Sequence, residues 1–140
     1  LDVHSPNLLW LPDRQGIHRI GFLDFQDALI GPSAYDVASL AQDARISVPP
    51  ALERDIIDHY VRLRRAADPD FDSEAFADAY AILAAQRATK IIGVFARLAD
   101  YARKPAYLQH IPRVREYLAR SLAHPVLSGL SVWYERHHLP

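Results

Sequence analysis

Three oxygen-bearing side chains near the amino-terminal end of the sequence have types and a spacing that could do chemistry. Asp2 and Asn7 lie five positions apart in LDVHSPNLLWL, and Asp24 follows the apolar segment that begins at Ile17. Carboxylate and amide oxygens are the ligands that a hard cation such as Mg²⁺ prefers. A separate carboxylate can accept or orient the proton of a hydroxyl group. This set predicts a metal site at Asn7 and Asp24, with Asp2 as a catalytic base.

The segment between the two predicted metal ligands has the pattern of a β-hairpin. Residues 8–11 form a short apolar run, residues 12–16 form a turn cluster, and residues 17–23 alternate well enough to form a second strand. An antiparallel hairpin brings its two ends together. We therefore expect Asn7 and Asp24, 17 positions apart in the sequence, to lie side by side at its open end.

The order of loop, hairpin and acidic turn is the layout of a phosphotransfer catalytic loop followed by a metal-binding aspartate. Transfer of a nucleotide γ-phosphoryl group requires Mg²⁺ to offset the charge of the phosphates. Taken alone, the spacing between Asp2 and Asn7 is a weak signal. The alternative is that Asp2 is a frayed terminal residue, Asn7 a turn former and Asp24 a strand cap. The joint pattern, with Asp36 after a tyrosine at the start of a helix, favours phosphotransfer.

The remainder of the sequence has a helical period of apolar residues and predicts one mostly helical domain. Asp72 and Ser73 offer an N-cap for the longest predicted helix. Pro125 suits a first helical turn, where its missing N–H group has little cost. The predicted helices cover residues 35–41, 51–66, 73–98, 111–123 and 125–137.

Polar residues on the longest predicted helix are candidates for an acceptor pocket. Gln86, Lys90, Gly93 and Arg97 recur on one stripe among apolar residues. An ordinary solvent-exposed face of an amphipathic helix is the alternative. A glycine in mid-helix costs roughly 1 kcal/mol relative to alanine, so Gly93 indicates close approach of another backbone or of a sugar. Gln86 and Arg87 cannot both face the same partner.

Three more residues of the amino-terminal region are candidates for supporting roles. His4 lies inside the predicted catalytic loop, where we expect it to brace the loop or face solvent. Asp27 lies three residues after Asp24 and either contacts metal or substrate or caps the following turn. Asp36 opens a predicted helix, where a carboxylate can satisfy backbone N–H groups, and is expected to be structural.

Composition excludes several classes of function. The chain has 140 residues, a formal net charge of −1 and no cysteine. The nearly neutral net charge disfavours nucleic-acid binding. The lack of cysteine excludes a disulfide framework and a thiolate zinc site. No apolar run approaches the roughly 20 residues of a membrane helix, so a cytoplasmic location with no membrane partner is expected. The sequence contains no methionine, and we expect an upstream part to be missing.

Two longer stretches carry a resemblance to a known family. LDFQDALIGPSAYDVASLAQDA and AAQRATKIIGVFARLADYARKPAYLQHIPRVREYL are similar to the carboxy-terminal lobe of aminoglycoside-phosphotransferase-like small-molecule kinases, a choline-kinase-like family with the protein-kinase architecture. Within that family they resemble cytoplasmic kinases that phosphorylate the anomeric hydroxyl of N-acetylmuramate and N-acetylglucosamine. The resemblance spans roughly residues 2–118.

The resemblance implies a fold, a reaction and roles for individual residues. The fold would be a mainly α, kinase-like carboxy-terminal lobe over residues 1–140, with a short hairpin and about five helices. Asp2 would be the catalytic base, Asn7 and Asp24 would hold Mg²⁺, and Asp36 would brace the catalytic loop. The co-substrate would be ATP, and part of the stripe containing Lys90 would line the sugar pocket.

The resemblance also implies that the amino-terminal nucleotide lobe is absent from these residues. Its own missing lobe is then a partner of the chain, and we expect the chain alone to bind no ATP and to be inactive. Two alternatives are an aminoglycoside phosphotransferase and a non-catalytic kinase-like binding module. The mixed charge of the helical half favours a neutral or anionic sugar over a polycationic antibiotic.

Overall fold

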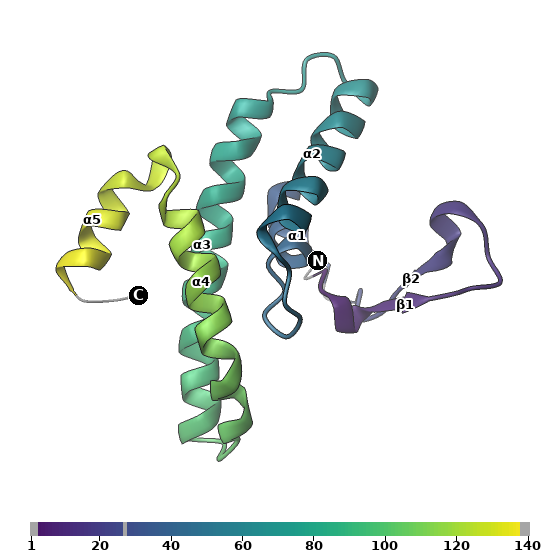
Figure 1. Ribbon diagram of the computed structural model, residues 1–140. Helices are drawn as coiled ribbons and strands as arrows, with labels where there is room; N and C mark the ends of the chain where they lie inside the picture. Colours follow the sequence, from purple (N-terminus) through teal and green to yellow (C-terminus); the bar gives the residue numbers. More distant parts are fainter. Residues whose placement is uncertain (1–2, 27, 138–140) are drawn as a thin grey trace.

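The computed structural model describes residues 3–26 and 28–137. Over these residues it contains five α-helices and one antiparallel two-stranded hairpin, which confirms the predicted mainly helical fold. The hairpin lies to one side of the helices (Figure 1). The helices are α1 (Ser33–Ala41), α2 (Pro50–Ala67), α3 (Ser73–Asp100), α4 (Ile111–Leu122) and α5 (Ser128–Arg136).

The hairpin pairs strand β1 (Leu8–Trp10) with strand β2 (Ile20–Phe22), in a register that places Leu8 opposite Phe22. The second strand is shorter than the predicted residues 17–23. Residues Gly16–Arg19 form a short 3₁₀ helix, η2, instead. Gly16 has a φ of 56°, a left-handed conformation that glycine adopts without steric cost. This residue turns the chain into η2 and delays the start of β2.

The helix boundaries follow local capping chemistry. The side chain of Asp72 accepts hydrogen bonds from the backbone of Glu74 and Ala75, so the predicted N-cap of α3 is confirmed. The predicted last helix is wrong in its first turn, because Pro125–Leu127 form a separate 3₁₀ helix, η4, before α5. There the ring of His124 accepts a hydrogen bond from the backbone of Val126 and caps the start of η4.

Helix α3 is the central element of the core. One cluster packs its second half against α4 and includes Phe95, Val114 and Leu118. The other packs its first half against α1 and α2 and includes Ala38 and Phe76. Buried alanines on both sides of α3 allow the neighbouring helices to approach closely. Figure 1 shows α4 running alongside α3. Within the described ranges, no helix is both long and apolar enough to cross a membrane.

We expect Leu118→Ala to destabilise the domain by about 2–5 kcal/mol, because it removes buried methyl groups and leaves a cavity in a close-packed core. The side chain of Leu118 is 1% exposed, whereas Leu63 on α2 is 55% exposed. Chemical denaturation followed by circular dichroism measures the difference. Leu63→Ala is the matched control and should change the free energy of unfolding by less than about 1 kcal/mol. Equal effects of the two substitutions would contradict the assigned core.

Candidate active site

The open end of the hairpin brings the two predicted metal ligands to one place. The backbone N–H of Leu23 donates to the carbonyl oxygen of Asn7 at 2.8 Å, and Asp24 is the next residue. Asn7 ends a short 3₁₀ helix, η1 (Ser5–Asn7), and is half-buried, while Asp24 is exposed. The backbone segments that carry Asn7 and Asp24 therefore meet at the open end of the hairpin, as the antiparallel pairing predicts. The predicted base, Asp2, lies outside the described residues.

Asp24 has a backbone conformation that is uncommon for residues other than glycine, although aspartate adopts it more often than most. Its φ is 56°, in the left-handed region. Non-glycine residues in this region are few, and they cluster at functional sites. The side-chain amide of Gln26 donates to the Asp24 carboxylate at 2.6 Å. The turn thus holds the carboxylate at the end of the hairpin.

Asn7 and Asp24 have side chains of the types that a magnesium ion shared with a nucleotide takes as ligands. Mg²⁺ in phosphotransfer sites is usually held by one or two protein ligands, with phosphate oxygens and water completing its shell. Asn7 and Asp24 supply one amide oxygen and one carboxylate. No three His, Asp or Glu side chains gather into a metal site among the residues that the structure describes, so an all-protein metal cage is not indicated there. The assignment of Asn7 and Asp24 as ligands stays a prediction.

Sequence reasoning missed Asp43, which holds the predicted catalytic loop at Ser5. Its carboxylate accepts the backbone N–H of Ser5 at 2.8 Å, across 38 positions of sequence. Its other oxygen accepts the backbone N–H groups of Arg45 at 2.8 Å and Ile46 at 3.3 Å. Asp43 is completely buried. One carboxylate therefore joins the loop after α1 to the segment between His4 and Asn7.

These hydrogen bonds determine the charge state of Asp43. Burial raises the pKa of the Asp43 carboxyl, but hydrogen bonds from the backbone of Arg45 and from Ser5 outweigh it, so the pKa lies below its ordinary value. Asp43 is thus ionised at neutral pH, and its charge strengthens each hydrogen bond that it accepts.

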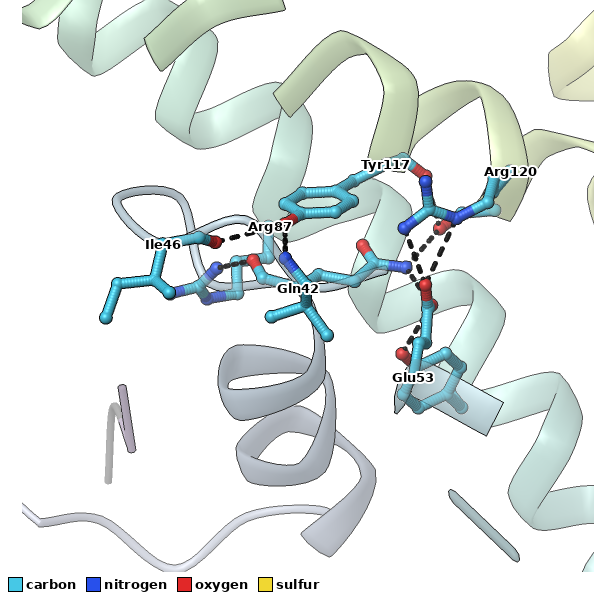
Figure 2. A network of polar contacts seen from close by, with 9 residues as sticks. Gln42, Ile46, Glu53, Arg87, Tyr117 and Arg120 are labelled. Carbon is cyan, nitrogen blue, oxygen red and sulfur yellow. Dashed lines mark hydrogen bonds and ion pairs between the residues drawn. The ribbon is translucent and has the colours of Figure 1, made fainter. Parts of the chain in front are cut away.

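A buried polar network holds the loop that carries Asp43 (Figure 2). The side-chain amide of Gln42 donates to Glu53 at 2.7 Å. The same carboxylate accepts the hydroxyl of Tyr80 at 2.8 Å and forms an ion pair with Arg120 at 2.6 Å. Burial, followed by the nearby Glu53 charge and its hydrogen bond, raises the pKa of the Tyr80 hydroxyl well above its ordinary value. Tyr80 therefore remains a neutral donor.

The backbone of the same loop is held by three further side chains. Tyr117 donates its hydroxyl to the carbonyl of Ile46 at 3.2 Å and accepts the backbone N–H of Val48 at 3.0 Å. Arg87 donates to the carbonyl of Gln42 at 3.2 Å, as Figure 2 shows. Arg113 donates to the carbonyl of Ala44 at 3.1 Å. The loop lacks regular secondary structure, but side chains from α3 and α4 satisfy much of its buried backbone.

A cavity of about 170 Å³ opens beside the catalytic loop. Its lining includes Lys90, whose role in an acceptor pocket stays a prediction, together with His4, Tyr35, Arg45 and Arg87. Three of these side chains are cationic. The cavity borders the loop that the predicted base belongs to, which is where an acceptor hydroxyl would have to enter.

The other predicted substrate residues lie elsewhere. Gln86 and Arg97 are exposed and outside the lining of this cavity, because the inward stripe of α3 runs one step round the helix, through Arg87. Their substrate role stays a prediction. A Cβ at Gly93 would meet no atom within 4 Å, so the predicted close approach of another backbone is wrong among the described residues. Asp27 lies outside the described residues.

The two predicted bracing residues lie near the site. Asp36 is half-buried in the first turn of α1, whose N-cap is Pro32. A carboxylate at this position interacts favourably with the helix dipole. The ring of His4 lines the cavity, and its carbonyl accepts the backbone N–H of Asn7 at 2.9 Å. Their bracing roles stay predictions, whereas the hydrogen bond from Ser5 to Asp43 is a direct brace.

A larger cavity of about 280 Å³ lies between α2, α3 and α4. Glu53, Tyr80 and Arg120 line it, but their polar groups already bond to one another. None of the predicted site residues that the structure describes lines this cavity. Its size therefore does not make it the candidate active site.

A helical lobe carrying a catalytic-type loop and a hairpin with an acidic turn is the arrangement of a kinase-like carboxy-terminal lobe. The sequence profile described as the phosphotransferase enzyme family matches residues 1–70. The chain belongs to this family.

Individual relatives are named more narrowly. The chain is 42% identical over 136 residues to an N-acetylmuramate/N-acetylglucosamine kinase of Caulobacter vibrioides, covering 97% of this chain and 36% of the relative. Proteins with the same name from Pseudomonas putida and Neisseria meningitidis are 40% and 41% identical, over 70% and 73% of this chain and 30% and 31% of the relatives. The chain thus spans about a third of the length of these relatives.

We expect Asp43→Asn to lower the free energy of unfolding by about 2–3 kcal/mol at pH 7, because it removes the charged acceptor of three backbone N–H groups. The folded pKa of Asp43 lies below its unfolded value, so its contribution is present above about pH 4 and is lost as the pH falls through the folded pKa. Denaturant titrations of the wild type and of Asp43→Asn at several pH values from 7 to 3 measure both free energies of unfolding. The difference between them should decrease as the pH falls.

The same substitution at an exposed aspartate of α2, Asp58→Asn, is the control. It should leave the free energy of unfolding within about 0.5 kcal/mol of the wild type. A difference between wild type and Asp43→Asn that stays constant down to pH 3 would contradict the assigned charge.

Proposed function

We propose that this chain supplies the catalytic loop and acceptor pocket of an ATP-dependent phosphotransferase that acts on the anomeric hydroxyl of an amino sugar, N-acetylmuramate or N-acetylglucosamine. The observation that best supports this proposal is the backbone hydrogen bond from Leu23 to Asn7. It brings the segments that contain Asn7 and Asp24 together at the edge of the predicted catalytic loop. The names of the relatives, N-acetylmuramate/N-acetylglucosamine kinases, support the acceptor class.

The proposed reaction assigns one task to each residue. The hydroxyl oxygen of the sugar forms a bond to the γ-phosphorus of ATP, while the bond from that phosphorus to the bridging oxygen breaks and ADP leaves. Asp2 accepts the hydroxyl proton. Asn7 and Asp24 hold Mg²⁺, which neutralises charge on the phosphates. Asp43 holds the loop at Ser5 through a hydrogen bond from the Ser5 backbone.

The charge of the cavity supports a sugar acceptor over an aminoglycoside. Arg45, Arg87 and Lys90 line the cavity, and its lining among the described residues includes no aspartate or glutamate. A polycationic antibiotic would meet repulsion there, whereas a neutral or anionic sugar would not. The charges therefore favour the sugar kinases among the alternatives.

We propose further that residues 1–140 form one lobe of the kinase-like fold. The hairpin exposes large apolar side chains, with Trp10 62% and Phe22 51% exposed. Such patches mark surfaces that contact another protein segment. In a protein of the relatives' length, additional chain would cover this face and contribute to ATP binding. The 140 residues alone are then expected to show no measurable ATP turnover.

The test is a phosphotransfer assay with ATP and Mg²⁺ on the complete protein that carries this chain. N-acetylmuramate, N-acetylglucosamine and kanamycin are compared as acceptors, and ³¹P NMR identifies the phosphorylated position. We expect phosphate on the anomeric oxygen of one or both sugars and none on kanamycin. Turnover of kanamycin alone would overturn the proposal.

We expect Asp2→Asn in that protein to lower kcat by about 10²–10⁴-fold, because the amide cannot accept the hydroxyl proton. Steady-state kinetics with saturating sugar and ATP measure the change. The control is Asp13→Asn, at an exposed position of the hairpin turn, which should retain wild-type kcat. An unchanged kcat for Asp2→Asn would remove Asp2 from the mechanism and leave another group as the base.

A further inference from the structure

The cavity beside the catalytic loop has an uneven distribution of charge and polarity. Its walls are formed by the catalytic loop, α1, the loop after α1 and α3. Ile91, Val94 and Phe95 form an apolar part of the lining, while Arg45, Arg87 and Lys90 are its cations. A ligand that fits this lining has an apolar face and a negative charge.

Two of the three cations are available to a ligand. Arg87 is 95% buried and already donates to the carbonyl of Gln42. Lys90 and Arg45 have exposed side chains, and neither has an ion pair with another described residue. The backbone of Arg45 is fixed by its hydrogen bond to Asp43. The cavity lining therefore includes two exposed cations, Lys90 from α3 and Arg45 from the loop after α1.

The two sugars in the relatives' names differ by one group. N-acetylmuramate carries a lactyl group as an ether on the oxygen of carbon 3, and this group ends in a carboxylate. N-acetylglucosamine has a neutral hydroxyl at the same carbon. Hydrogen bonds between a cation and a carboxylate are roughly twice as strong as neutral ones. Two cations that have no ion pair with another described residue can therefore distinguish the two sugars by charge.

We propose that Lys90 and Arg45 bind the carboxylate of the lactyl group and make the site selective for the anionic sugar. This inference rests on the proposed function, because it assumes that the cavity receives the acceptor. Lys90 and Arg45 are specificity residues that contact a part of the sugar remote from the anomeric hydroxyl. Their removal therefore affects binding of N-acetylmuramate and leaves the chemical step unchanged.

The alternative ligand for the same charges is the phosphate chain of the nucleotide. In that case the substitutions would weaken ATP binding equally with both sugars. The KM for ATP, measured at saturating sugar, separates this outcome from carboxylate binding.

The experiment measures kcat and the KM of each substrate for Lys90→Gln and Arg45→Gln in the complete protein. We expect each variant to raise the KM for N-acetylmuramate about tenfold, the equivalent of about 1.4 kcal/mol. The KM for N-acetylglucosamine, the KM for ATP and kcat should change less than twofold. Both side chains are exposed, so thermal denaturation should show wild-type folding.

Lys104→Gln is the matched control, because it removes the same charge at an exposed position outside the cavity. It should leave every constant unchanged. An equal rise of KM for both sugars, or a rise of KM for ATP, would overturn the carboxylate assignment while leaving the sugar kinase in place. A wild-type protein that phosphorylates neither sugar would overturn the proposed function itself.

Discussion

The carboxylate of Asp43 is completely buried and accepts backbone N–H groups from two segments that are far apart in the sequence. An ionised group in a protein interior is tolerated only when hydrogen bonds replace its hydration. Here those bonds come from Ser5 on one side and from the loop after α1 on the other. The same contact that makes the buried charge tolerable therefore attaches the catalytic loop to the helical body.

The network around Glu53 extends this attachment to three helices. Glu53 belongs to α2, Tyr80 to α3 and Arg120 to α4, and Gln42 connects their polar groups to the loop that holds Asp43. Networks of this kind stabilise a structure only when each member is satisfied, since an unpaired buried group is costly. The network thus holds the helices in one arrangement relative to the loop. Apolar packing alone would allow more than one arrangement.

Much of the fold could be predicted because it depends on local pattern. The helical period placed α1 to α4 within a few residues, and the turn cluster at residues 12–16 placed the hairpin. The meeting of Asn7 with Asp24 followed from antiparallel pairing. The short β2 was not predictable from alternation, because the left-handed Gly16 redirects the chain into η2.

The parts of the site that depend on tertiary contacts could not be predicted. Asp43 is one of several acidic residues in a short stretch, and only the fold shows that it reaches Ser5. The periodicity of α3 defined a polar stripe but not which side of it meets the catalytic loop. Consecutive residues of a helix point about 100° apart around its axis. A shift of one residue in the expected inward face therefore decides whether Gln86 or Arg87 lines the cavity.

The left-handed backbone of Asp24 has a consequence for how this site could change in evolution. Asparagine and glycine tolerate the same conformation, so either could replace Asp24 with little strain in the turn. Both lack the carboxylate. If Asp24 holds the metal as proposed, the position permits loss of the carboxylate without loss of the fold, and one substitution would produce a folded homologue that lacks this metal ligand.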